Sequence, residues 1–456
     1  MDGGMPASPA PAWSTALGDA IRGGDADGAM RAGLAAVEAK VAPVEIARPA
    51  ALAYGESVDT AKREPLRGLL ALSAAVRLSR TLGTRLKALP VLRALTLAAG
   101  DAKVRPSERR RPRRVSGEIS HLTRSFEYAV RTGAFEDAVS IFSGLLVEGK
   151  ERVMAGDILF RVAAEDGVGG GHKLVYAVKA WQLASALGWR GGDVVMGPVV
   201  ARVATGIQDD SAYRTIMGAW GREKVDVAAV GGNAGPAEGP DREAIVAALR
   251  ASTPEESAKA VVLALKRGVA PDALASLVVR EGAFRVASAA KYDPGAIGSL
   301  VFSDAARWVL RFSKTESRVL PVLQSCLLLR AQPAARGALR ERPQANVEAA
   351  LRDLAACVEA SKDLDAAELA QSILAKGAPA VPVVETLVRE LCKDGPGGNL
   401  GPNLVLADAA VEAATAYAPP VREALVALAR GLAQSPRDRS GWPAVEAALG
   451  PAITSS

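Results

Sequence analysis

A long internal repeat constrains the fold of this chain more than any other feature, because repeated segments are expected to build repeated structures. The segment AIRGGDADGAMRAGLAAVEAKVAPVEIA, which begins at Ala20, aligns without a gap on ALRASTPEESAKAVVLALKRGVAPDALA, which begins at Ala248. In this alignment Val41-Ala42-Pro43 meets Val269-Ala270-Pro271. Compositional bias alone rarely produces a gapless match of this length.

Further blocks along the chain keep nearly the same spacing. The paired positions are Leu89 and Leu320, Asp137 and Asp365, Gly149 and Gly377, and Asp166 and Asp394. The arginine-rich stretch after residue 104 likewise meets an Arg- and Pro-containing stretch at 332–344. We therefore predict a tandem duplication, with halves at 14–222 and 242–450 joined by a Gly/Pro/Ala-rich linker at 223–241.

Each half also contains two related units. The segment AIRGGDADGAMRAGLAAVEAK resembles AVRTGAFEDAVSIFSGLLVEGK, which begins at Ala129. Both predict a helix that ends at glycine, an acidic residue in the turn, and a second helix. We predict four units of roughly 85 residues, as in arrays whose repeats cannot bury their apolar faces alone.

Composition and periodicity both predict helices. Hydrophobic residues make up 49% of the chain but aromatic residues only 4%, so the core consists mainly of Ala, Leu and Val, which suit closely packed helices. Val139, Phe142 and Leu146 recur at steps of three and four residues, and Thr253-Pro254 is typical of a helix start. The predicted fold is all-α, a duplicated helical array that is solenoid- or bundle-like.

Cysteine usage and hydropathy exclude several classes of protein. The three cysteines show no C-x-x-C spacing, which argues against a disulfide framework and a zinc site. The N-terminal residues lack the pattern of a signal peptide, and no uncharged apolar run is long enough to span a bilayer. We expect a soluble cytoplasmic protein with no membrane partner and no bound metal.

The net charge of +6 comes partly from one run, RPSERRRPRR. Its arginines are Arg105, Arg109, Arg110, Arg111, Arg113 and Arg114. One interpretation is a solvated linker between helices. The other is a contact with phosphate or RNA, since clustered arginines bind anions, although aromatic interleaving and a nucleic-acid motif are missing. The sequence therefore does not favour a nucleic-acid partner.

A glycine-rich stretch, AEDGVGGGHKLVYAVKAWQLASALGW at 164–189, precedes a long apolar helix pattern. Glycine turns before helices can bind phosphate, so Gly170 and Gly171 are candidate ligand contacts. The stretch matches neither the P-loop nor the dinucleotide-binding motif. The second half keeps Gly397 and Gly398 at the corresponding place but has no histidine there. We interpret the stretch mainly as a turn between helices.

His172 and His121, the chain's two histidines, are the candidate catalytic residues. Each stands at a predicted helix start, where a neutral imidazole can act as a base or a ligand, or can simply cap the helix. Tyr176 and Trp181 follow His172 and are either core residues or the wall of a ligand pocket. If both histidines line one cavity, they form a site together. Other catalytic motifs, such as H-E-x-x-H and G-x-S-x-G, are absent from the sequence.

The glycine turn followed by H-K-L-V-Y-A-V-K-A, within a duplicated Ala-rich helical chain, resembles the questin oxidase-like family and the helical domains that bacteria carry beside Rieske iron–sulfur modules. This resemblance implies an all-helical fold with histidines at helix starts and an enzyme that oxidises aromatic polyketides with NADPH. Only His172 matches such a histidine, and the Rieske C-x-H…C-x-x-H pattern is absent.

Two hypotheses of function follow. The first is a non-catalytic helical repeat protein that needs no cofactor and binds a protein partner through a groove on its surface. The second is an oxidoreductase-type helical enzyme with His172 in its site and NADPH as its cofactor. The shortage of catalytic side chains favours the first hypothesis.

Overall fold

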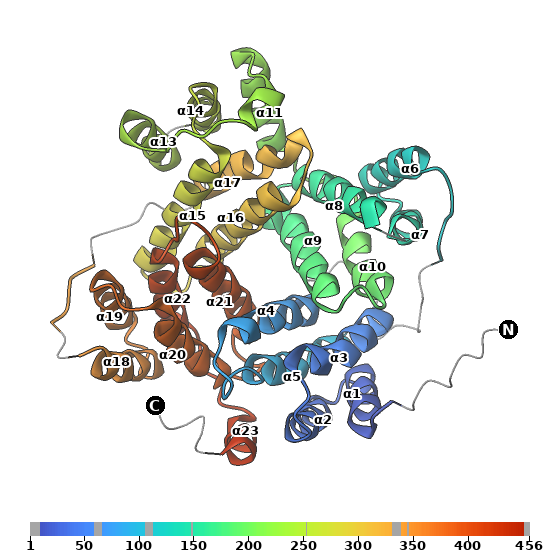
Figure 1. The fold of residues 1–456 in the computed structure, drawn as a ribbon, viewed down its shortest axis with the longest axis vertical. Coiled ribbons are helices and arrows are strands. Elements are labelled where there is room, and N and C mark those ends of the chain that lie inside the picture. Colours follow the sequence, from blue (N-terminus) through green and yellow to red (C-terminus); the bar gives the residue numbers. More distant parts are fainter. Residues whose placement is uncertain are drawn as a thin grey trace.

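The computed structural model describes residues 10–58, 66–104, 113–146, 149–251, 253–330, 339–343 and 346–450. Helices make up 75% of the structure, and within these ranges the chain forms 23 α-helices and no strand (Figure 1). Gly235 and Val269 form an isolated bridge. The prediction of an all-α fold is confirmed.

The N-terminal part of the chain forms the first group of helices. These are α1 (Ala12–Gly23), α2 (Ala26–Glu38), α3 (Pro43–Ser57), α4 (Arg67–Thr81), α5 (Leu89–Val104), α6 (Ile119–Thr132), α7 (Phe135–Leu145), α8 (Gly149–Ala164), α9 (Val168–Ala186), α10 (Gly192–Val203) and α11 (Ser211–Glu223). A single short helix, α12 (Val227–Val230), follows within the predicted linker.

The C-terminal part of the chain forms the second group. These are α13 (Gly239–Ala251), α14 (Pro254–Lys266), α15 (Pro271–Ser288), α16 (Pro294–Phe312), the 3₁₀ turn η1 (Glu316–Val319), α17 (Leu320–Arg330), α18 (Val347–Glu359), α19 (Asp363–Ala375), α20 (Ala380–Cys392), α21 (Leu400–Thr415), α22 (Glu423–Gln434) and α23 (Trp442–Leu449). In the repeat alignment the starts of α2 and α14 coincide, as do those of α6 and α18. The tandem duplication itself and its boundaries stay predictions.

Four long helices, α4, α9, α16 and α21, surround the middle of the molecule (Figure 1). Each packs against two of the others, since α4 contacts α9 and α21, and α16 contacts the same two helices. The helix hairpins α1–α2, α6–α7, α13–α14 and α18–α19 lie at the periphery. The helices therefore close around a centre, and the arrangement is bundle-like rather than an open solenoid.

The centre of the molecule is polar. The ammonium nitrogen of Lys179 on α9 lies 2.5 Å from the carboxylate of Asp408 on α21, which also accepts a 2.8 Å hydrogen bond from Arg77 on α4. Arg77 bonds Glu412 as well, and the Tyr417 hydroxyl donates to the other oxygen of Glu412 at 3.0 Å. These pairs join helices from the two predicted halves. Because they are buried, each charge depends on its partner for stabilisation.

Candidate functional site

The glycine-rich stretch is a tight left-handed turn at the start of α9. Gly169, Gly170 and Gly171 have φ angles of 62°, 77° and 80°, which side chains other than glycine rarely adopt. A Cβ atom on Gly171 would lie 2.3 Å from the ring of Phe302, whereas one on Gly170 would meet nothing within 4 Å. The run of glycines is therefore explained by backbone geometry and by close packing against α16.

Asp166 holds this turn together. Its carboxylate accepts hydrogen bonds of 3.0 Å from the backbone N–H groups of Val168, Gln208 and Asp209, and it pairs with Lys173 at 2.8 Å. Burial alone would raise the pKa of Asp166, but these hydrogen bonds outweigh burial and lower it. Within the turn, the N–H group of Val168 is thus used by Asp166, and those of Gly170 and Gly171 donate to the Gly167 carbonyl at 3.0 and 3.1 Å.

His172 follows the turn and is exposed on the surface. The surrounding protein nevertheless lowers the pKa of its imidazole by desolvation, and the positive charge of Arg202 lowers it further. The imidazole therefore favours its neutral form. Its ring centre lies 6.2 Å from that of Tyr176, which is buried.

Tyr176 and Trp181 both have only 3% of their surface exposed. Trp181 packs edge-to-face with Phe160, Trp189 and Phe312 at ring-centre distances of 5.5, 4.6 and 5.4 Å. This cluster joins α8, α9 and α16 and fills the core. Of the two interpretations from the sequence, the structure places these side chains in the core, and neither lines a described pocket.

His121 lies on α6, at the periphery of the molecule, and lines a groove between α6 and α7. His172 does not line this groove. A catalytic role for either histidine, and with it the oxidoreductase hypothesis, stays a prediction.

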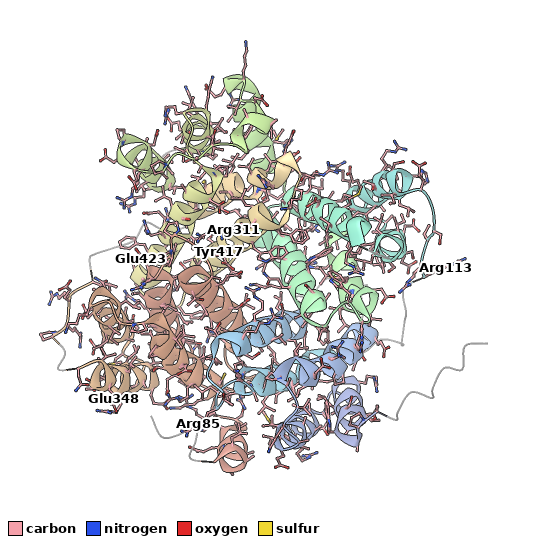
Figure 2. All side chains as sticks on the ribbon, viewed as in Figure 1. Arg85, Arg113, Arg311, Glu348, Tyr417 and Glu423 are labelled. Carbon is pink, nitrogen blue, oxygen red and sulfur yellow. The ribbon has the colours of Figure 1, made fainter. Side chains whose placement is uncertain are left out.

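The arginine run is described only at its end. Arg105, Arg109, Arg110 and Arg111 lie outside the described residues. Arg113 is exposed at the edge of the molecule (Figure 2), and Arg114 forms a 3.0 Å ion pair with Asp193 on α10. An anion contact in this run stays a prediction.

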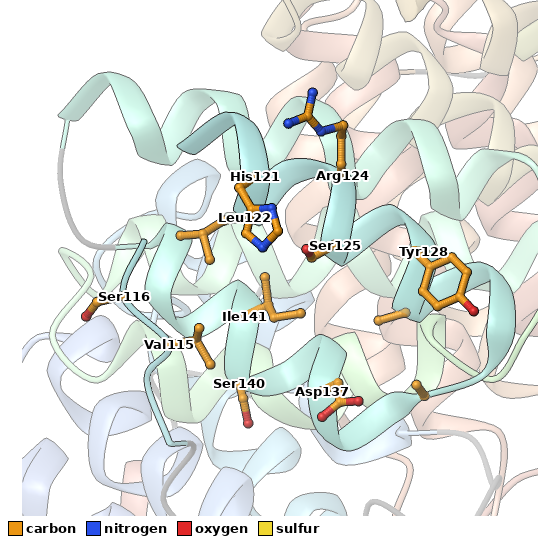
Figure 3. A pocket seen from close by; sticks show the side chains of 12 residues that line it. Val115, Ser116, His121, Leu122, Arg124, Ser125, Tyr128, Asp137, Ser140 and Ile141 are labelled. Carbon is orange, nitrogen blue, oxygen red and sulfur yellow. The ribbon is translucent and has the colours of Figure 1, made fainter. Parts of the chain in front are cut away.

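The α6–α7 groove has a volume of about 670 Å³. It is lined by Val115, Ser116, His121, Leu122, Arg124, Ser125, Tyr128, Ala129, Ala134, Asp137, Ser140 and Ile141. His121 and Ser125 point from α6 toward Ile141 on α7, and Tyr128 lies at one end (Figure 3). Small and aliphatic side chains line the floor, and polar ones line the rim.

Local packing explains why the groove is stable without an occupant. Below it, Phe126 and Phe142 hold α6 and α7 together at a ring-centre distance of 5.1 Å, and both rings are buried. Above it, Tyr128 has 71% of its surface exposed, the largest value among the exposed large hydrophobic residues. This ring is accessible to another molecule that enters the groove.

A second groove lies between α1 and α2, with a volume of about 650 Å³. It is lined by Ala12, Trp13, Ala16, Asp19, Ala20, Asp25, Gly28, Arg31, Ala32 and Ala35. When Ala20 is aligned on Ala129, as in the inner repeat, all of these positions except Ala35 fall on residues that line the α6–α7 groove. Trp13 thus corresponds to Leu122, and Asp19 to Tyr128. The two grooves are the same face of two similar helix hairpins.

In both α6–α7 and α18–α19, the segment that precedes the first helix lies along the second. In the first half, the Val115 N–H donates to the Ser140 carbonyl of α7 at 3.2 Å. The non-helical segment 339–343 precedes α18, and the backbone N–H of Arg342 donates to the Ser372 hydroxyl at 2.8 Å. The Arg342 guanidinium pairs with Glu368 at 2.8 Å and with Asp365. In the repeat alignment these two acids correspond to groove residues of α7, namely Ser140 and Asp137.

Sequence reasoning found His121 but missed the groove that contains it. The sequence feature that could have revealed the groove is the inner repeat, because its helix hairpins carry small residues at the same positions. Periodicity shows which residues can share a helix face, but whether another helix covers that face is decided by tertiary packing.

Comparison with known protein families, curated proteins and solved structures gives no match. The resemblance to the questin oxidase-like family therefore stays a hypothesis. Among the described residues, no helix is long and apolar enough to cross a membrane, and no cluster of three His, Cys, Asp or Glu side chains is arranged to hold a metal.

Proposed function

We propose that this chain is a non-catalytic helical scaffold that binds a segment of a partner protein in the α6–α7 groove. The observation that carries this proposal is the groove itself, a hollow of about 670 Å³ lined by Tyr128, which has 71% of its surface exposed.

The surface of the groove supports this proposal. Its floor of Leu122, Ala129 and Ile141 offers apolar contact, and the small side chains let a backbone approach closely. The side chains of Arg124 and Asp137 form no hydrogen bond or ion pair with other described residues. Charged rims around an apolar floor are typical of specific protein interfaces.

Site-specific photo-crosslinking tests the proposal. A photoreactive phenylalanine analogue is placed at Tyr128 of the full chain, which is then expressed in its own cells and irradiated. We expect one discrete cross-linked protein. After purification, that protein should bind the unmodified chain with a measurable Kd.

Two variants provide controls. The same analogue at Phe284, an exposed aromatic residue on α15, should give no such product. Ser125→Trp fills the groove and should weaken binding of the purified partner by at least about tenfold, the effect of losing roughly 1.4 kcal/mol of contacts. Equal cross-linking from Phe284, or unchanged affinity of the Ser125→Trp variant, would contradict the proposal.

A further inference from the structure

The buried ion pairs at the centre of the molecule include one acid that has no hydrogen bond. Asp304 on α16 is fully buried, and neither of its carboxylate oxygens has a hydrogen-bond partner among the described residues. The ammonium nitrogen of Lys179 lies 3.9 Å from Asp304 and 2.5 Å from Asp408. We infer that Lys179 is a proton-controlled switch, which pairs with Asp408 alone while Asp304 is neutral and with both acids once Asp304 is ionised.

Burial holds the proton on Asp304. A buried carboxylate that accepts no hydrogen bond is costly, so the neutral acid is favoured. Burial raises the pKa of Asp304 well above its usual range, and the nearby charge of Glu412 raises it further. The charge of Lys179 acts in the opposite direction. Asp304 therefore stays neutral at pH values at which an ordinary aspartate is ionised, and it loses its proton at higher pH.

Lys179 is the one described cation within ion-pair distance of Asp304. Arg77 is already bound to Asp408 and Glu412. The guanidinium of Arg307 packs over the ring of Tyr417 at 4.1 Å and donates to a backbone carbonyl. An ionised Asp304 therefore attracts Lys179, whose nitrogen needs to move only about 1 Å to reach a charge-assisted hydrogen-bond distance of about 2.8 Å.

Loss of the proton also balances the charge of the central cluster. Its ionisable side chains are three bases and three acids, namely Arg77, Lys179, Arg307, Asp304, Asp408 and Glu412. While Asp304 keeps its proton, the cations outnumber the anions by one. Lys179 can serve two acids because an ammonium group has three donors, and Asp408 keeps its 2.8 Å hydrogen bond from Arg77.

The charged side chains of the other elements packed on α16 have partners of their own. On α15 the pairs are Asp272 with Arg311, Arg280 with Glu423 and Glu281 with Arg250, and Arg285 donates to the Leu249 carbonyl. In η1, Glu316 is exposed and Arg318 donates to the Ser313 carbonyl. Helix α17 has no acid or base before Arg330, and burial raises the pKa of its Cys326 thiol to about 12. The Tyr417 hydroxyl donates to Glu412.

The switch joins the two predicted halves of the chain. Lys179 lies on α9 in the first half, whereas Asp304 on α16 and Asp408 on α21 lie in the second. With Asp304 neutral, Lys179 ties α9 to α21; with Asp304 ionised, it also ties α9 to α16, a helix that α9 already contacts. None of these residues lines the α6–α7 groove, so the switch does not depend on the proposed function.

Infrared and NMR spectroscopy of the full chain test the inference together. The carbonyl stretch of a neutral carboxyl group is separate from the bands of carboxylates, and the spectrum of Asp304→Asn identifies the part that belongs to Asp304. We expect this band to persist where ordinary aspartates are ionised and to disappear at higher pH. In a chain labelled with ¹³C at the lysine Cε atoms, one lysine signal should shift with the same midpoint, and Asp304→Asn should abolish that shift.

Two lysine variants of α9 sharpen the test. Lys179→Met removes the cation that favours ionised Asp304, so the midpoint of the carboxyl band should rise by at least about one pH unit, a tenfold change in proton affinity. Lys173→Met is the matched control, because Lys173 is another buried lysine of α9 and pairs with Asp166 at 2.8 Å. It should leave the midpoint within about 0.3 pH unit, as expected for a separate pair.

The lysine signal needs only Asp304→Asn as its comparison, so it decides the question even if Lys179→Met fails to fold. A carboxyl band that is never lost, or one that is lost without any lysine shift, would overturn the inference. So would a lysine shift that persists in Asp304→Asn, or equal midpoints in the two methionine variants.

Discussion

Asp304, in the centre of the molecule, shows how one buried residue links stability to pH. Its side chain is fully buried, and neither carboxylate oxygen has a hydrogen-bond partner among the described residues. Lys179 is 3.9 Å away. Desolvation raises the pKa of Asp304 well above its usual range, and the nearby charge of Glu412 adds to this effect. The folded protein therefore binds this proton more tightly than the unfolded chain does.

The contribution of Asp304 to stability is fully present below the pKa of an unfolded aspartate, and it is lost as pH rises through the raised folded value. Asp304→Asn should abolish this loss of stability at high pH, because the amide mimics the neutral acid. We expect the variant to gain on the order of 1 kcal/mol at pH 8 over the unmodified chain, and little at pH 4. Urea unfolding at both pH values measures the effect. An unchanged pH dependence would show that Asp304 does not titrate in this way.

Removing the charge of Asp408, on the neighbouring helix α21, should instead destabilise the folded protein. It pairs with both Lys179 and Arg77, so Asp408→Asn leaves two buried cations with less compensation. We expect a loss of about 3–5 kcal/mol in the free energy of unfolding. Glu348→Gln, which breaks an exposed pair with Arg352 at the edge of the molecule (Figure 2), should cost less than about 1 kcal/mol. Similar losses in the two variants would contradict the central role of Asp408.

At the scale of elements, short turns and helix hairpins determine how the long helices meet. The turn before α9 uses glycine for two separate reasons, a left-handed backbone at each position and close packing at one. In two of the hairpins, the segment before the first helix packs on the second helix. Segment 339–343 lies on α19, and Val115 lies on α7 at the edge of the α6–α7 groove.

Alanine substitutions separate the two reasons for glycine in the turn. Gly170→Ala places a Cβ in open space and should cost only the backbone strain, about 1–2 kcal/mol. Gly171→Ala adds a clash with Phe302, so its cost should exceed that of Gly170→Ala by about 1–3 kcal/mol. Thermal unfolding of the two variants, compared at one pH, measures the difference. Equal losses of stability in the two variants would mean that α9 and α16 can move apart to accommodate the added Cβ without further cost.

At the scale of the whole molecule, the helices close on themselves. Helix α4 packs on α21, and α9 on α16, so each predicted half contributes two helices to the central group. Its ion pairs couple the halves, because Arg77 and Lys179 come from one and Asp408 and Glu412 from the other. Mispairing of these helices would leave buried charges without partners, which favours this one arrangement.

The helical periodicity, the Ala- and Leu-rich core and the glycine stops were enough to predict an all-α fold, because they act over a few residues. The capping box of Thr253 and Glu256 forms at the predicted start of α14 for the same reason. The repeat spacing predicted which helices would resemble one another. None of these local signals states which helix lies beside which.

Only the tertiary structure decided which polar residues became core and which became surface. Lys179 and Asp408 are far apart in sequence, and nothing in either segment shows that they meet in a buried pair. Likewise, Asp137 and Asp365 occupy matching places in similar helices, yet Asp365 is covered by Arg342 and Asp137 is open. Burial and pairing depend on neighbours from distant segments, whereas helix formation depends on residues within a few turns.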